Sequence, residues 1–177
     1  MRLSLAIDTS TSRTIVGIID GTSVLFEKFH EGATDHGRAL SELVAEALKV
    51  SAPPQQVVVG MGPGPFTGLR VGISFAHTFG LARNIPVIGI CSLDAIDIDQ
   101  SEYTVAIDAR RKEIYWARYK DGHRVEGPTV SKPTEVDGVI IDQYPDMKKL
   151  VSLSTSQNVT EPMYLRRPDA VPTGERT

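Results

Sequence analysis

Short aliphatic runs separated by polar turns open the chain and predict a β-meander. The segments 3–8 (LSLAID), 14–20 (TIVGIID) and 23–29 are rich in aliphatic and aromatic residues, as strands are. Asp20-Gly21, between the second and third segments, is a hairpin turn signal. The chain is therefore expected to begin with three strands in a meander.

Two helical patterns follow, each leading into a further strand. The apolar residues of the first helix recur on one face: Leu40, Leu43, Val44, Ala47 and Leu48. Pro53-Pro54 ends this helix, and 57–60 reads as a short buried strand. A second helix begins near Thr67 and stops at Asn84, ahead of a strand at 87–91. The predicted order is βββαβαβ.

The pattern of the first segments then recurs in the second half of the chain. LAID at 5–8 returns as VAID at 105–108, and each copy leads to a second strand that ends in Asp-Gly, at 20–21 and at 121–122. This repeat predicts two lobes, 1–98 and 99–177, with a polar boundary at 97–102 (DIDQSE). The second lobe is shortened, with only GVII and a helical stretch at 147–153 after its meander. We expect an α/β fold with two ribonuclease-H-like lobes of the actin-like, sugar-kinase and Hsp70 ATPase architecture.

Composition narrows the functional classes. The 177 residues carry 22 acidic and 19 basic side chains, and this net charge of -3 argues against autonomous nucleic-acid binding. No apolar stretch approaches the roughly 18–20 residues of a membrane span, and the N-terminus has no signal-peptide pattern. Cys91 is the only cysteine, so we expect no internal disulfide and a cytoplasmic location.

The glycine-rich segment 60–68 (GMGPGPFTG) suggests a phosphate loop but matches neither common fingerprint. The pattern GxxxxGK[ST] requires a lysine where Leu69 stands, and GxGxxG fails because Gly68 comes one residue too late. We interpret the loop as a sharp strand-to-helix turn. We expect its glycines and prolines to set the path of the backbone rather than to bind phosphate.

The helix after this loop carries small residues at every fourth position: Gly68, Gly72, Ala76 and Gly80. Glycine inside a helix costs roughly 1 kcal/mol relative to alanine, so a close approach of another backbone should offset that cost. One alternative is that the stripe lies on the chain's own sheet. Because the helix is apolar nearly all round, we expect a second protein to cover it. The predicted interface residues are His36, Leu40, Leu43, Val44, Leu69, Gly72, Ile73, Ala76 and Gly80.

The turn after the first strand (DTSTS) offers a carboxylate and several hydroxyls. In the two-lobed architecture an acidic residue at this place faces the nucleotide phosphates, and Asp8 stands there with Thr9, Ser10 and Thr11. We predict weak binding of ATP or ADP with Mg²⁺ at these residues, and no required cofactor. The alternative is a turn capped by its own side chains.

Catalytic groups are sparse. His36 and Glu42 could suggest a metal site, but His36 fits better near the first turn of a helix, and we expect no metal. Cys91 ends an aliphatic strand without a basic neighbour, which favours a buried, inert thiol. The basic turn DARRK at 108–112 reads as a solvated turn, with a supporting contact to tRNA or a partner as the alternative.

Ordered motifs over nearly the whole chain resemble one family. LAIDTST, GPGPFTGLRVGISFAHTFGLA, ICSLDA, AIDARRKEIYWARY and EPMYLRRPDA are similar to segments of the TsaB (YeaZ) family, although the second lobe is shorter than that family's pattern. The resemblance implies a non-catalytic scaffold that activates the paralogue TsaD, together with the ATPase TsaE. The activity implied is transfer of a threonylcarbamoyl group to the adenosine beside the anticodon of tRNA.

The resemblance also implies that tRNA is contacted only through the complex and that the chain can form a homodimer when alone. Two other functions stay open. An independent actin-like ATPase or small-molecule kinase would need a phosphate-binding glycine in DTSTS and a catalytic acid in the interlobe cleft. A peptidase would need a metal pair or a Ser/His/Asp set, and neither is visible in the sequence.

Overall fold

The computed structural model describes residues 2–166 and contains two β-sheets in the order that the sequence predicts. The first sheet holds the strands β1 (Leu3–Asp8), β2 (Arg13–Asp20), β3 (Ser23–Glu31), β4 (Gln56–Gly60) and β5 (Val87–Ile90). The second holds β6 (Glu102–Asp108), β7 (Ile114–Lys120), β8 (His123–Ser131) and β9 (Val139–Ile140). The helices are α1 (His36–Ala47), α2 (Phe66–Arg83) and α3 (Met147–Leu153), with short 3₁₀ turns η1 (Ser92–Ala95) and η2 (Pro133–Glu135).

The two sheets share one topology, which confirms the predicted two-lobed α/β fold. The strand order is β3-β2-β1-β4-β5 in the first sheet and β8-β7-β6-β9 in the second. In each sheet the first strand of the meander also pairs in parallel with the fourth strand, β1 with β4 and β6 with β9. The internal repeat seen in LAID and VAID is therefore a repeat of topology, and each sheet is ribonuclease-H-like.

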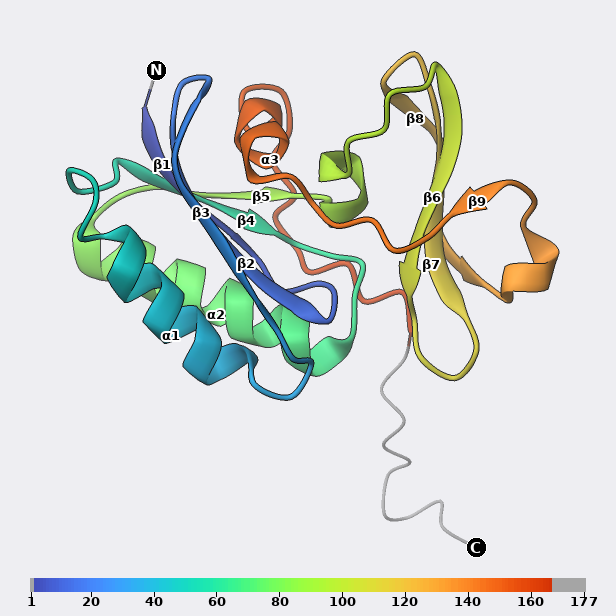
Figure 1. The fold of residues 1–177 in the computed structure, drawn as a ribbon, viewed down its shortest axis with the longest axis horizontal. Coiled ribbons are helices and arrows are strands. Elements are labelled where there is room, and N and C mark those ends of the chain that lie inside the picture. The colour runs from blue at the N-terminus through green and yellow to red at the C-terminus, as the bar shows by residue number, and fades with distance from the viewer. Residues whose placement is uncertain (1, 167–177) are drawn as a thin grey trace, which may run out of the picture.

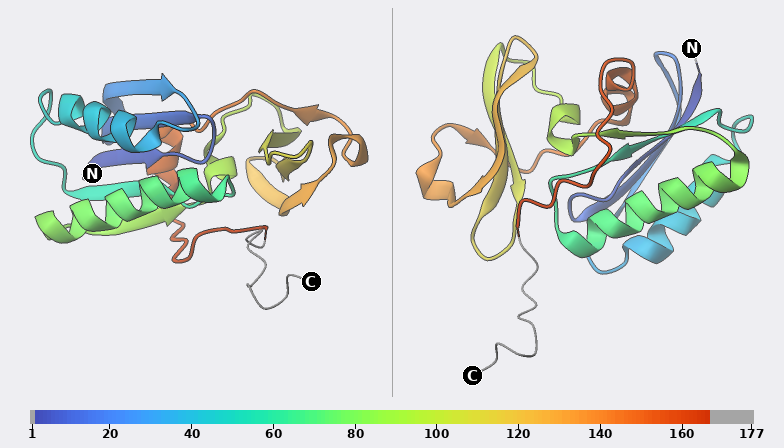
Figure 2. Two further views of the ribbon diagram at one scale, coloured as in Figure 1. Left: turned by 90° about the horizontal axis from the view of Figure 1, so that it is seen from below. Right: turned by 180° about the vertical axis from the view of Figure 1, so that it is seen from behind.

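Helices cover both faces of the first sheet. α1 and α2 lie side by side on one face, and α3 lies on the other (Figures 1 and 2). α2 ends where the sequence predicts, because Asn84 adopts a left-handed conformation (φ 52°) and caps the helix. At the start of α3, the Asp146 carboxylate accepts a hydrogen bond from the Lys149 amide at 2.6 Å.

The last described segment returns the chain from the second sheet to the first. α3 packs on β1, β2 and β4 although it follows β9 in the sequence. After α3, the Val159 amide donates to the Gly89 carbonyl at 2.7 Å and the Met163 amide to the Met61 carbonyl at 2.8 Å. The division at 98/99 stays a prediction, but part of the predicted second lobe helps to build the first sheet's core. The end of the EPMYLRRPDA motif, 167–170, lies outside the described residues.

Candidate functional site

The turn after β1 is closed by its own hydrogen bonds. Asp8 is fully buried, and its Oδ1 accepts from the Ser10 amide at 2.8 Å and from the Ser10 hydroxyl at 2.7 Å. Its Oδ2 accepts from the Ser92 hydroxyl at 2.6 Å. Thr9, also buried, donates from Oγ1 to the Gly68 carbonyl at 2.7 Å. These bonds tie the β1–β2 turn to η1 and to the start of α2.

The glycine-rich loop lies directly against this turn. A Cβ atom at Gly60 would overlap Asp8 Oδ2, and one at Gly64 would lie 2.5 Å from the Ser10 carbonyl oxygen. Side chains at these positions would push the loop away from the turn. The glycines therefore allow two backbone segments to approach each other, and the space that a phosphate would need beside Asp8 is filled by the protein.

The residues predicted to bind nucleotide do not offer free ligands to a Mg²⁺-nucleotide complex in this structure. Asp8, Thr9 and Ser10 are at most 1% exposed, and the polar side-chain atoms of all three take part in internal hydrogen bonds. Only Thr11 reaches a cavity, of about 240 Å³. Binding of ATP or ADP at this turn would require the turn to open, and it stays a prediction.

Burial of Asp8 has a measurable electrostatic consequence. Loss of hydration raises the pKa of the Asp8 carboxyl above its ordinary value, and the hydrogen bonds from Ser10 and Ser92 act in the opposite direction. The His36 imidazole is also removed from water, which lowers the pKa of His36. His36 lies within hydrogen-bond distance of Thr14, with 2.8 Å between His36 Nδ1 and Thr14 Oγ1.

The raised pKa of Asp8 predicts a pH-dependent difference between the wild type and Asp8→Asn. A carboxyl that holds its proton more tightly in the folded state stabilises that state at low pH and loses this contribution as pH rises through the folded pKa. As pH falls from 7 towards the ordinary aspartate value of roughly 4, the free energy of unfolding of the wild type should rise relative to that of Asp8→Asn. Urea unfolding of both proteins at a series of pH values measures this difference.

Asparagine keeps an acceptor for Ser10 and adds an amide that can donate to Ser92, so the variant should fold. Asp8→Ala leaves these partners without the carboxylate and should be the least stable of the three proteins at neutral pH. A stability difference between wild type and Asp8→Asn that stays constant with pH, or changes in the opposite direction, would contradict the assigned pKa shift.

The residues predicted to form a partner interface are buried within the chain itself, and their role in an interface stays a prediction. The side chains concerned are at most 8% exposed: His36, Leu40, Leu43, Val44, Leu69, Ile73 and Ala76. Gly72 and Gly80 are buried too. A Cβ atom at Gly72 would overlap Thr9 Oγ1, and one at Gly80 would overlap Val87 Cγ2. The small-residue stripe allows α2 to lie close to β1 and β5, so an interface would have to use the outer faces of the helices.

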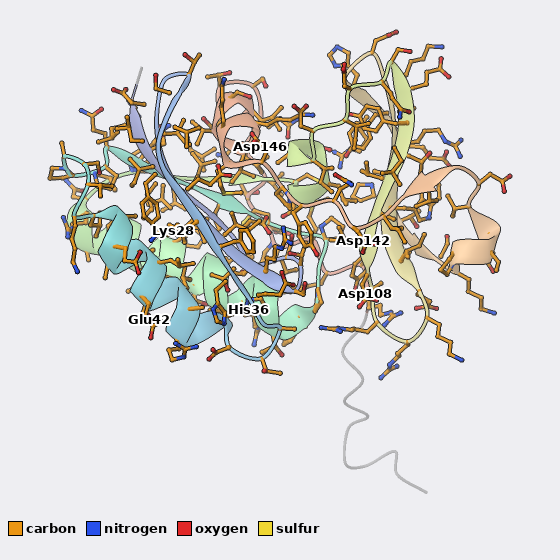
Figure 3. All side chains as sticks on the ribbon, viewed as in Figure 1. Lys28, His36, Glu42, Asp108, Asp142 and Asp146 are labelled. Atoms are coloured by element: carbon orange, nitrogen blue, oxygen red, sulfur yellow. The ribbon has the colours of Figure 1, made fainter. Side chains whose placement is uncertain are left out.

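The other candidate groups are placed apart from one another. His36 is buried, whereas Glu42 is exposed on α1 and pairs with Arg38 at 2.8 Å (Figure 3). Within residues 2–166, no group of three or more His, Cys, Asp or Glu side chains is arranged to hold a metal ion. Cys91 is buried, as predicted, but the expectation that it has no basic neighbour was wrong, because Arg124 donates to its Sγ at 3.2 Å. Burial outweighs this neighbour and raises the pKa of the Cys91 thiol to about 12. No helix in the described part of the chain is long and apolar enough to cross a membrane.

The cavity lies between the two sheets. Its wall combines the first meander turn, the end of β6 and the segment before α3: Thr11, Ser12, Pro65, Ala106, Ile107, Asp108, Arg110, Asp142, Gln143 and Tyr144. Figure 3 labels Asp108 and Asp142 on the second lobe's side of this region. Asp108 pairs with Arg110 of the same wall at 3.3 Å, so the described wall carries one cation against two carboxylates.

Sequence reasoning missed the segment 142–144. It follows β9 without a periodic pattern, and only the return of the chain towards α3 brings it to the cavity. Tyr144 also stacks on the Arg13 guanidinium, whose carbon lies 3.6 Å from the ring centroid. For the rest of the cavity wall a sequence signal was available. Asp8 and Asp108 occupy equivalent places in the repeat, and this equivalence predicts that the two meander turns face each other.

Sequence comparisons match the chain to a family model named for tRNA modification, to uncharacterized mycobacterial proteins and to proteins named TsaB. The family model described as "TsaD: tRNA N6-adenosine threonylcarbamoyltransferase" matches residues 30–176. An uncharacterized protein of Mycobacterium tuberculosis (strain H37Rv) is 39% identical over 197 residues, covering 95% of this chain and 93% of that protein. The Escherichia coli (strain K12) tRNA threonylcarbamoyladenosine biosynthesis protein TsaB is 32% identical over 145 residues, covering 73% of this chain.

Some of these relatives are longer than the chain. A Mycobacterium leprae uncharacterized protein is 40% identical over an alignment 204 positions long. This alignment covers 97% of this chain but 57% of that protein. The match to Escherichia coli TsaB covers 62% of the relative. Among solved structures, a Pseudomonas aeruginosa protein described as similar to peptidase YEAZ superposes with a TM-score of 0.79 at 22% identity. That match covers 94% of this chain and all of the other chain, and it shows a shared fold.

Proposed function

Because the chain belongs to the TsaB (YeaZ) family, we propose that it is a non-catalytic subunit that binds and activates a TsaD-like paralogue. The complex would transfer threonylcarbamoyl to the adenosine next to the anticodon of tRNA, in the cytoplasm, with a TsaE-like ATPase as a further partner. The observation that carries the proposal is the double match, to relatives named TsaB and to the TsaD family model. A chain related to the transferase itself can pair with it through equivalent elements.

The placement of reactive groups supports a non-catalytic role. The Asp8 carboxylate is buried and accepts hydrogen bonds on both oxygens, so it has no access to a substrate. The Cys91 thiol is buried, and its raised pKa keeps it protonated at neutral pH. His36 lies within hydrogen-bond distance of the Thr14 hydroxyl, but Thr14 is fully buried, so this hydroxyl has no access to a substrate. We therefore assign the chemistry to the paralogue and a positioning role to this chain.

The outer faces of α1 and α2 are the surface that we assign to the paralogue. The two helices lie side by side on one face of the first sheet (Figure 2). Between the buried stripe and the solvent, the Phe75 and Phe79 rings stack with centroids 6.0 Å apart and are only half-buried. Ser74 and Thr78 are exposed on the same helix. Aromatic side chains are enriched in the core of protein–protein interfaces, so the partly exposed rings on this face support the assignment.

Depletion of the chain from its own cells should lower threonylcarbamoyladenosine in total tRNA, because the paralogue would lose its activator. A plasmid carrying the wild-type gene should restore the modification. The double variant Ser74→Glu/Thr78→Glu should not restore it, since two carboxylates would stand in the proposed interface. Nucleoside analysis of digested tRNA measures the modification, and affinity capture measures the bound paralogue.

The matched control is Ser152→Glu/Thr155→Glu, which places the same charges at exposed positions in and after α3, on the opposite face of the first sheet. It should restore the modification and capture the paralogue. Normal threonylcarbamoyladenosine in depleted cells would contradict the proposed function. Restoration by Ser74→Glu/Thr78→Glu, with the paralogue still captured, would contradict the interface alone.

A further inference from the structure

We propose that the chain contacts tRNA directly, in contrast to the expectation that tRNA is reached only through the complex, by a surface that combines cations with two exposed aromatic rings. This basic-aromatic surface consists of Phe66, Arg70, Arg110, Lys112, Tyr164 and Arg166. It would bind an unpaired stretch of RNA, with phosphates near the cations and bases stacked on the rings. The identification of the RNA as tRNA rests on the proposed function, whereas the surface itself rests on the contacts described next.

Three distant parts of the chain meet at this surface: the start of α2, the β6–β7 turn and the last described residues. The Phe66 and Tyr164 rings lie with centroids 4.9 Å apart at 44°. Arg166 pairs with Glu113 and donates to the Arg110 carbonyl at 3.3 Å, which ties the last residues to the β6–β7 turn. In Figures 1 and 2, the segment after α3 runs between the start of α2 and the β6–β7 turn.

The local charge is opposite to that of the whole chain. Among the described residues, the four cations outnumber three neighbouring carboxylates: Asp108 and Glu113 pair with Arg110 and Arg166, and Asp142 lines the same cavity as Arg110. Arg70 and Lys112 have no ion pair among residues 2–166. A protein with a net charge of -3 can therefore present a positive surface here, and a phosphate backbone is attracted to the local field rather than to the net charge.

The exposed rings add a feature that charge alone does not provide. Phe66 is 43% exposed and Tyr164 is 38% exposed, so each ring keeps a large part of its area in water. The Arg70 guanidinium carbon lies 4.3 Å from the Phe66 ring centroid. Exposed rings with cations beside them provide stacking platforms for unpaired bases, while the cations contact the phosphates. Aromatic residues also occur at protein interfaces, so a protein occupant is one of the outcomes that the test distinguishes.

Binding of unmodified tRNA should therefore depend on both kinds of residue. Fluorescence anisotropy with a labelled tRNA transcript would be measured for the full chain alone and for its complex with the paralogue, at several salt concentrations. We expect affinity to fall as salt rises. Arg70→Glu/Lys112→Glu should weaken binding by about tenfold or more at low salt. Phe66→Ala/Tyr164→Ala should weaken binding by about fivefold or more while the salt dependence stays unchanged.

Matched controls lie away from the surface. Lys49→Glu reverses an exposed charge beyond the end of α1, and Phe29→Ala removes a ring that is 55% exposed on β3. Both should bind tRNA like the wild type, and thermal unfolding should show that every variant is folded. Equal tRNA binding by wild type and by both surface variants would overturn the proposal. So would surface variants that lose the paralogue but keep tRNA, since the occupant would then be a protein.

The outcomes separate this inference from the proposed function. If threonylcarbamoyladenosine is normal in depleted cells while the surface variants still lose RNA binding, the proposed function fails and the surface stands. If the complex forms and modification depends on the chain, but the surface variants bind tRNA as the wild type does, only the surface fails.

Discussion

Replacing Gly72 by leucine should unfold the first sheet and its helices rather than only release a partner. A Cβ atom at Gly72 would overlap Thr9 Oγ1 and lie 3.3 Å from Thr9 Cβ, and Thr9 Oγ1 is held by its hydrogen bond to the Gly68 carbonyl. Leucine adds further atoms in the same direction. We expect the free energy of unfolding to fall by about 3 kcal/mol or more, measured by urea unfolding followed by circular dichroism.

Gly37→Ala is the matched control on the neighbouring helix. Gly37 lies in the first turn of α1, and a Cβ atom there would meet nothing within 4 Å. Alanine should raise the free energy of unfolding by about 0.5 kcal/mol, because it restricts the unfolded chain. If Gly72→Leu has the stability of the wild type and no longer captures the paralogue, the stripe faces a partner and its placement on the sheet is wrong.

Leu150→Ala should destabilise the protein although Leu150 lies on a short helix that follows both sheets in the sequence. Leu150 is fully buried and packs with Ile15, Ile19 and Val58 on the face of the first sheet opposite α1 and α2. Removing its side-chain atoms leaves a cavity in this cluster, and we expect the free energy of unfolding to fall by about 3 kcal/mol. Urea unfolding measures the loss, and hydrogen exchange in β1 and β2 shows where protection decreases.

Lys148→Ala on the same helix provides the comparison. Lys148 is exposed, so its truncation should change the free energy of unfolding by less than about 0.5 kcal/mol. Equal effects of Leu150→Ala and Lys148→Ala would show that α3 adds little to the first sheet. A loss of protection confined to the second sheet would contradict the packing of α3 that the structure describes.

Local patterns were sufficient to predict the elements and their order. Alternation and Asp-Gly turns located both meanders, and the helical stretch expected at 147–153 coincides with α3. Such predictions succeed because turn residues and the hydrophobic period act on neighbours in sequence. The repeat of LAID and VAID also predicted the shared strand order, because equivalent strands begin from equivalent positions in each sheet.

The candidate site was predictable only in part. DTSTS was recognised as the turn whose acidic residue faces the nucleotide phosphates in the two-lobed architecture, and Thr11 of this turn lines the cavity between the sheets. Its closure was not predictable, because it depends on Ser92, which lies far along the chain and donates to Asp8. For the same reason Tyr144 and Tyr164 carried no signal in the sequence. Each acquires its role from residues brought close by the fold.

The sequence by itself determined the βββαβαβ order, the repeat and the sharp glycine turn into α2, since propensity and periodicity act over a few residues. Only the tertiary structure decided that the stripe of small residues on α2 faces the chain's own sheet. The polar residues Arg70, Ser74 and Thr78 lie on the exposed side of α2, so the expectation of a helix that is apolar nearly all round was wrong. The inward placement of the stripe depends on contacts over long separations, such as that of Gly72 with the Thr9 side chain, which leaves no room for a Cβ atom.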